Sequence, residues 1–143
     1  MKAELNYNNC FFEISELIGK IPDSIAVNEE EALIEMAVVV KRNVESRLNR
    51  SSLDDSAKNY DGSKPYKHMK DDVKFTVSRD RNGGLYAKIQ GGKNTGYKWK
   101  FLNDGTVRNG MIHTRATHFI DHSLSDSEHD IGSIVDRTIS KSI

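Results

Sequence analysis

The sequence predicts an α+β fold in which an antiparallel β-meander packs against a long N-terminal helix and a C-terminal helix. Apolar residues recur at helical spacing over residues 28–50 and again over residues 118–140. Between these stretches, apolar and polar residues alternate over residues 72–102, with glycine-rich turns in between. The 143 residues contain no long low-complexity segment, so we expect residues 1–143 to form a single domain.

The stretch 28–50 has the charge polarity of a helix as well as its spacing. Asn28 is a candidate N-cap with Glu31 three residues later. Arg47 and Arg50 in the last turn match the helix dipole. The predicted buried stripe, widened by Ile34 and Val38, consists of Leu33, Met36, Ala37, Val40, Val44 and Leu48.

Two further helices are predicted, one at each end of the chain. Within residues 1–22, apolar residues at helical spacing before Pro22 indicate a short amphipathic helix. These residues are Phe11, Ile14, Leu17, Ile18 and Ile21. The C-terminal helix, residues 118–140, has Thr117 as its expected N-cap, although Ser125 with Glu128 could instead cap a shorter helix. Its apolar arc comprises Ile120, Leu124, Ile131, Ile134, Val135 and Ile139.

Three strands with one apolar face are predicted within residues 72–102. Their turns are expected at "DRNGGL" and "GGKNTG". The residues on the apolar face are Val73, Phe75 and Val77, then Leu85, Ala87 and Ile89, then Tyr97, Trp99 and Phe101. Residues 51–71 and 103–117 lack periodicity and are predicted as exposed loops, with Asp71 and Asp72 in a solvated turn.

Charge is distributed unevenly along the chain, although the net charge is zero. Residues 1–57 carry 6 basic and 11 acidic side chains, and residues 116–143 carry 2 and 5. The middle, residues 58–115, carries 13 basic and 5 acidic side chains. This basic middle segment indicates an electronegative partner, either nucleic acid or the acidic ends of a neighbouring copy, or else a solvated lysine face.

Neither a membrane span nor a secretion signal is expected. No run approaches the roughly 18 apolar residues that a span requires. The N-terminus lacks the basic and then apolar pattern of a signal peptide. The single cysteine, Cys10, excludes an intrachain disulfide and is expected to be a packing residue. We therefore expect a soluble protein made in a cytoplasm.

Four of the five histidines lie between His113 and His129. In a continuous helix His118, His122 and His129 would share one face with Asp126, and four-residue spacing lets two imidazoles reach one zinc ion. The pattern lacks the glutamate after the first histidine that serves zinc hydrolases as a base, so a polar surface is the favoured interpretation. Motifs of nucleophilic and phosphate-binding enzymes are also missing. We predict a non-enzymatic protein with no catalytic residue, metal or cofactor.

Three stretches carry a resemblance to a known family: "KPYKHMKDDVKF", "YKWKFLNDGT" and "ATHFID". In this order they resemble the tailed-bacteriophage tail components called gene-product-ten-like, which are related in role to the lambda Z tail-completion protein. The resemblance covers about residues 28–140. The residues that match its last two motifs are Trp99, Phe101, Asn103, Gly105, Thr106, Thr117, His118 and Phe119.

The resemblance implies a structural virion protein of a tailed phage, a tail-completion or head–tail connector subunit at the neck. Copies would form a ring, sixfold because tails of this type are sixfold, between neighbouring neck and tail proteins. Such a ring would lie close to the DNA in the channel and would assemble in the host cytoplasm.

Within such a ring, the predicted loop 103–117 is a candidate docking segment. Arg108, His113 and Arg115 give it positive charge, and it has no apolar pattern that would bury it. These three residues are therefore predicted to contact partners. The alternative is a loop that merely joins two elements.

A competing interpretation is a nucleic-acid-binding module built on the basic middle segment. Basic residues interleaved with aromatic ones can neutralise phosphates and stack on bases. Strand alternation, however, places Tyr97 and Trp99 opposite Lys98 and Lys100, which favours a core role for the aromatic residues. The lysines of this alternative are Lys64, Lys67, Lys70, Lys74, Lys98 and Lys100.

Overall fold

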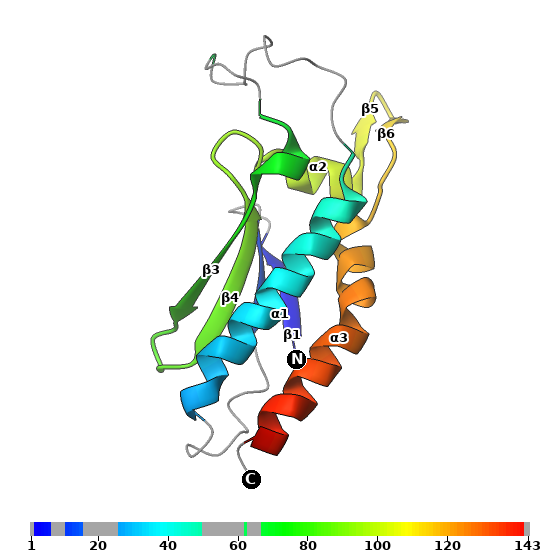
Figure 1. Ribbon diagram of the computed structural model, residues 1–143. Helices are drawn as coiled ribbons and strands as arrows, with labels where there is room; N and C mark the ends of the chain where they lie inside the picture. Colours follow the sequence, from blue (N-terminus) through cyan, green and yellow to red (C-terminus); the bar gives the residue numbers. More distant parts are fainter. Residues whose placement is uncertain (1, 7–10, 16–25, 50–61, 63–66, 142–143) are drawn as a thin grey trace.

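The computed structural model describes residues 2–6, 11–15, 26–49, 62 and 67–141. Figure 1 shows a sheet crossed by one long helix, with a second long helix beside the first. The helices are α1 (Ala26–Arg47), α2 (Lys98–Asp104) and α3 (Phe119–Lys141), with a 3-10 turn, η3, at Met69–Asp72. The strands are β1 (Lys2–Asn6), β2 (Phe11–Ser15), β3 (Val73–Arg79), β4 (Leu85–Gly91), β5 (Thr106–Arg108) and β6 (Met111–Thr114). None of these helices is long and apolar enough to cross a membrane.

The fold class is confirmed as α+β, because α1 packs against β3 and β4 on one side and against α3 on the other. The main sheet is antiparallel with strand order β1-β2-β4-β3. Helix α1 begins at Ala26, so Asn28 lies inside the first turn and the prediction that it is the N-cap is wrong. The helix ends at Arg47, three residues before the predicted end.

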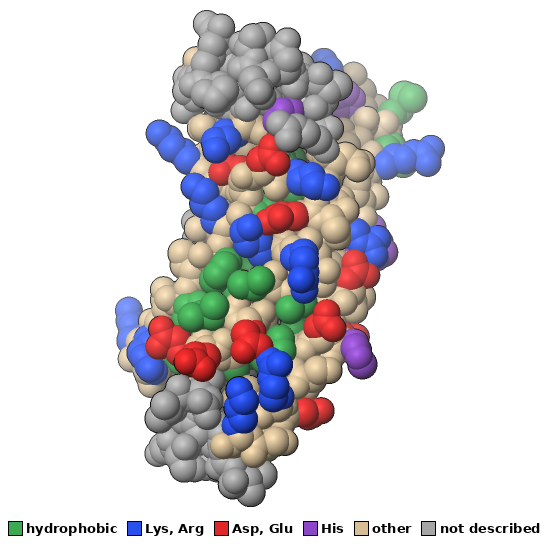
Figure 2. Space-filling model, viewed as in Figure 1, with side chains coloured by type: hydrophobic (Ala, Val, Ile, Leu, Met, Phe, Trp, Pro, Cys, Tyr) green, Lys and Arg blue, Asp and Glu red, His purple; other side chains and the backbone are tan. Residues whose placement is uncertain are grey.

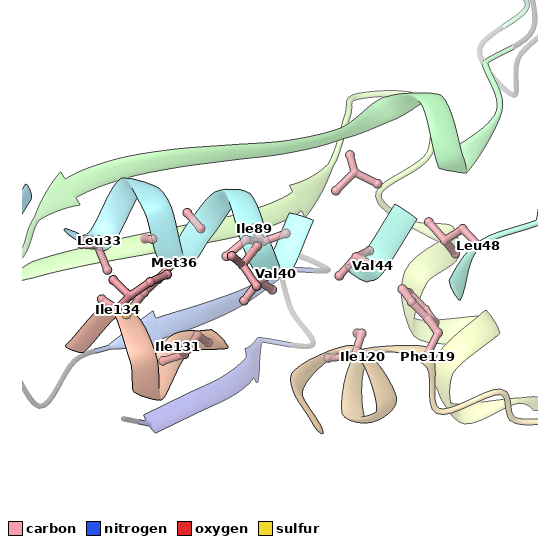
Figure 3. Packing of buried hydrophobic residues seen from close by; sticks show 14 of the residues in the cluster. Leu33, Met36, Val40, Val44, Leu48, Ile89, Phe119, Ile120, Ile131 and Ile134 are labelled. Atoms are coloured by element: carbon pink, nitrogen blue, oxygen red, sulfur yellow. The ribbon is translucent and has the colours of Figure 1, made fainter. Parts of the chain in front are cut away.

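The buried stripe of α1 was predicted correctly and forms the centre of the core (Figure 3). Each of its six side chains is at most 1% exposed. The predicted widening by Ile34 and Val38 is wrong, since these side chains are 39% and 45% exposed. The stripe widens instead through Ala32 and Val39, which are buried.

Helix α3 is continuous from Phe119, so the shorter helix capped at Ser125 is not formed. Ile120, Ile131 and Ile134 are buried as predicted, whereas Ile139 is exposed. The buried face also includes small hydroxyl residues, Ser123, Ser127 and Thr138. Each donates a hydrogen bond to the carbonyl four residues earlier, at 2.5, 2.7 and 2.8 Å respectively. These bonds satisfy the hydroxyl groups, so the three residues are buried at low cost.

The predicted helix within residues 1–22 is wrong where the chain is described, because residues 2–6 and 11–15 are strands. Strand β2 pairs with β4, with Phe12 opposite Ile89 and Ile14 opposite Ala87. A five-residue apolar stretch fits helical and strand periods almost equally well, and the ladder of β4 decides between them. The remaining residues of this prediction, and Cys10, lie outside the described part of the chain.

The predicted third strand of the meander is also wrong, because residues 98–104 form helix α2. "GGKNTG" is therefore a connection from β4 to a helix and not a hairpin turn. Its backbone already turns helically before α2, since the amide of Gly96 donates to the carbonyl of Gly92 at 2.9 Å. Within β3 and β4, Phe75 pairs with Ile89 and Val77 with Ala87 on the face toward α1, as alternation predicted.

The described end of the predicted loop 51–71 is partly buried, which corrects the expectation of a fully exposed segment. His68 and Asp72 are 3% and 4% exposed, whereas Asp71 is exposed. The Asp72 carboxylate accepts a hydrogen bond from the Thr95 hydroxyl at 2.9 Å. Asp72 therefore holds the β4–α2 connection in place and is not part of a solvated turn. Residues 51–61 and 63–66 lie outside the described part of the chain.

Polar contacts align α1 with α3. Arg47 forms a two-point ion pair with Asp126, with nitrogen-to-oxygen distances of 2.7 and 2.8 Å. The hydrogen bond from Arg47 lowers the pKa of Asp126, against a smaller opposing effect of desolvation. One turn closer to the middle of α1, the Asn43 amide donates to the Ser127 hydroxyl at 2.7 Å. These contacts fix the position of the two helices along their common axis.

Replacing Leu33 with alanine is expected to destabilise the protein by about 2–5 kcal/mol, because the change leaves a cavity between α1 and its neighbours. The matched control is Ile34→Ala, on the next residue, whose side chain is 39% exposed and whose expected effect is about 1 kcal/mol. Urea unfolding followed by circular dichroism measures both. Equal effects of the two substitutions would contradict the observed orientation of α1.

Replacing Asp126 with asparagine is expected to lower the melting temperature at pH 7. The folded-state pKa of Asp126 is depressed, so the stability from its ion pair is present above the unfolded pKa of about 3.9. That stability is lost as the pH falls through the folded pKa, so the two melting curves should converge below about pH 4. Thermal unfolding between pH 7 and pH 2 tests this, with exposed Asp130→Asn as the control. A constant difference across this range would contradict it.

Candidate protein-docking site

The residues of the two motifs "YKWKFLNDGT" and "ATHFID" lie at the end of the molecule where α2 approaches the start of α3. The rings of Trp99 and Phe119 pack edge to face, with centroids 5.4 Å apart and planes at 78°. Their side chains are at most 1% exposed. Trp99 is thus a core residue, as the alternation argument favoured, although it reaches the core from a helix and not from a strand.

Asn103 caps helix α3 from outside that helix. Its side-chain oxygen accepts a hydrogen bond from the amide of Ile120 at 3.1 Å, and its carbonyl accepts one from the amide of His118 at 3.1 Å. The prediction that Thr117 is the N-cap is wrong, because its hydroxyl donates to the carbonyl of Leu102 at 2.8 Å. His118 occupies the position before the helix, with a φ of 50°. A side chain 17 residues away therefore does what a local cap was expected to do.

Gly105 allows the end of α2 to approach the chain that returns from the hairpin. Its φ of 77° is unfavourable for residues with a side chain. A Cβ here would lie 2.7 Å from the carbonyl oxygen of Thr114 and 2.8 Å from the amide nitrogen of Ala116. Thr106 follows as the first residue of β5. Phe101 is 49% exposed and lies at the edge of this arrangement.

The segment 103–117 is not an irregular loop but carries a two-stranded hairpin. Val107 pairs with Ile112 and Arg108 with Met111 across a turn at Asn109 and Gly110. Both turn residues have positive φ, 53° and 75°. Asn-Gly between short apolar runs is the strongest local signal for such a turn, so the sequence "VRNGMI" could have predicted the hairpin. The predicted exposure is confirmed for residues 107–117, which are all exposed, but it is wrong for Asn103, which is 4% exposed.

The hairpin exposes large apolar side chains beside the predicted basic ones. Val107, Met111 and Ile112 are 70%, 74% and 74% exposed. Arg108, His113 and Arg115, the predicted partner contacts, are exposed in the same segment. Figure 2 shows hydrophobic and basic side chains protruding together where the hairpin lies. By strand alternation Val107 and Ile112 lie on one face of the hairpin and Arg108 and Met111 on the other. We call these six residues, which surround the hairpin, the hairpin surface. None of these apolar side chains is buried, as expected for a segment without an apolar pattern that would bury it.

His122, Asp126 and His129 lie on one exposed face of α3, as predicted, but His118 does not belong to the helix. His118 precedes the helix, whereas His122 and His129 lie on it, and all three are exposed. Asp126 is held by Arg47. Among the residues that the structure describes, no group of three histidine, cysteine or carboxylate side chains is arranged to hold a metal ion.

Of Tyr97 and Trp99, the two aromatic residues of the nucleic-acid-binding alternative, only Tyr97 is exposed. Trp99 is fully buried. Tyr97 is 38% exposed, and the Lys98 Nζ atom lies 5.8 Å from the centroid of its ring. Lys67, Lys70, Lys74 and Lys100 are exposed. Lys64 lies outside the described residues. Exposed lysines of this kind can contact phosphates. Trp99 cannot stack on a base, because it is buried.

Comparison with models of known families, with curated proteins and with solved structures found no match. The candidate site thus rests on its own geometry. Exposed apolar side chains grouped with polar ones are typical of surfaces that proteins bury against partners.

Replacing Gly105 with alanine is expected to destabilise the protein by roughly 2–4 kcal/mol, because the new Cβ would meet backbone atoms in addition to the strained φ. Gly110→Ala is the matched control. It has nearly the same φ, 75°, but no atom lies within 4 Å of its Cβ, so only about 1–2 kcal/mol of backbone strain applies. Chemical denaturation measures both. Equal losses would show that the close approach at Gly105 is not structurally important.

Proposed function

We propose that this chain is a structural virion protein of a tailed phage, a tail-completion or head–tail connector subunit that works as part of a ring at the neck. One observation carries the proposal. The hairpin surface presents three apolar side chains, each at least 70% exposed, outside the protein's own core. Such a surface fits a subunit that gains part of its stability by contact with neighbours.

The family resemblance supports the proposal through the same part of the molecule. The motif residues Trp99, Asn103 and Gly105 hold α2, the hairpin and the start of α3 together. A motif of this kind preserves the position of a docking hairpin. Structural virion proteins need this positional precision and no catalytic group.

The proposal predicts that the protein is present in purified phage particles and that Arg108→Glu combined with Arg115→Glu blocks the joining of heads to tails. The double variant should remain folded, because both side chains are exposed. Mass spectrometry of particles tests the first prediction, and electron microscopy of lysates with infectivity titres tests the second. The matched control is Arg81→Glu with Lys93→Glu, the same charge change at exposed positions in other turns.

Absence of the protein from purified particles would overturn the proposal. Normal infectivity titres from the hairpin variant would show that Arg108 and Arg115 have no docking role. Tight binding of the protein to a short duplex, with a steep loss on addition of salt, would favour the nucleic-acid-binding alternative.

A further inference from the structure

A second exposed apolar surface lies on the first half of α1. Ile34 and Val38 are 39% and 45% exposed and lie one turn apart. Glu30, one turn before Ile34, and its neighbour Glu31 are exposed as well. Figure 2 shows hydrophobic side chains with acidic and basic ones around them on the face of the molecule where α1 lies. We call Glu30, Glu31, Ile34 and Val38 the helix surface.

The helix surface and the hairpin surface are complementary in chemistry. Each combines exposed apolar side chains with charged ones, which are Glu30 and Glu31 on the helix and Arg108 and Arg115 on the hairpin. Contact between the two surfaces would remove the apolar side chains of each from water and bring their opposite charges together at the edge of the interface. Arg42, which follows Val38 by one turn, is exposed and marks the end of the acidic part.

The two surfaces cannot meet within one molecule. The hairpin lies at the end of the molecule where α1 ends (Figure 1). Ile34 precedes Arg47, the last residue of α1, by 13 residues, which corresponds to about 20 Å along the helix axis. Strands of three and four residues do not reach back over that distance. The partner must therefore be a separate molecule.

We infer that the hairpin surface of one copy docks on the helix surface of a second copy. Pairing of two hairpins with each other is disfavoured, because it would bring together Arg108 and Arg115 from both copies. Docking of hairpin on helix uses two different patches of one chain, so the contact is head to tail and can close into a ring. The inference rests on the proposed function for closure of the ring, and it assigns the surfaces by which neighbouring copies meet.

Charge reversal tests this pairing. Arg108→Glu/Arg115→Glu makes both surfaces acidic, and Glu30→Lys/Glu31→Lys makes both basic. Each variant alone should self-associate about tenfold or more weakly than the wild type. An equimolar mixture should associate again, because every contact between the two variants joins opposite charges. Sedimentation velocity over a concentration series measures this, and thermal unfolding checks that both variants are folded.

Three outcomes decide against the inference. A wild-type chain that stays monomeric up to about 1 mM overturns it. If Arg108→Glu/Arg115→Glu weakens self-association and Glu30→Lys/Glu31→Lys does not, the result indicates hairpin-to-hairpin pairing. Failure of the mixture to associate excludes the complementary contact. The control Arg81→Glu/Lys93→Glu should associate like the wild type. The presence of the protein in phage particles is measured separately. The failure of this inference can therefore be distinguished from the failure of the proposed function.

Discussion

The apolar stripe of α1 has to be covered on two sides, and the rest of the structure is arranged by this requirement. Seven of the 16 residues in the buried hydrophobic cluster belong to α1, and an eighth, Leu48, directly follows it. The sheet covers one side through β3 and β4, and α3 covers the other. Because Val44 and Leu48 extend the stripe to the end of α1, the start of α3 must lie there too (Figure 3). The position of α3 in turn decides where the hairpin can be.

The hairpin is held at both of its ends, although it is exposed. Asn103 joins the end of α2 to the start of α3, and Gly105 lets the two ends of the hairpin segment lie in contact. Trp99 anchors the same region in the core through Phe119. An exposed segment fixed in this way loses little conformational freedom on binding, which lowers the entropic cost of association. Its apolar side chains are therefore suited to docking without first having to be ordered.

Sequence patterns predicted the long elements of this fold but not the short ones. The stripe from Leu33 to Leu48 repeats over four turns, so only a helix satisfies it. In contrast, "FFEIS" is too short to distinguish strand from helix without its partner β4. "YKWKF" alternates like a strand but is a helix, because the preceding turn and the contact of Trp99 with Phe119 override the local pattern. At the candidate site, exposure and positive charge were predicted. The hairpin was missed although Asn109 and Gly110 signal it.

Separation of charge gives the exposed apolar residues a preferred partner. A short two-stranded hairpin with exposed Val107, Met111 and Ile112 would by itself favour unspecific association. Arg108 and Arg115 oppose contact between two hairpins, and they equally oppose contact with the basic middle segment of another copy. The acidic side chains near Ile34 leave the first half of α1 as a surface where both the apolar and the charged groups are matched. The same charges that keep identical hairpins apart thus favour the head-to-tail arrangement that a ring requires.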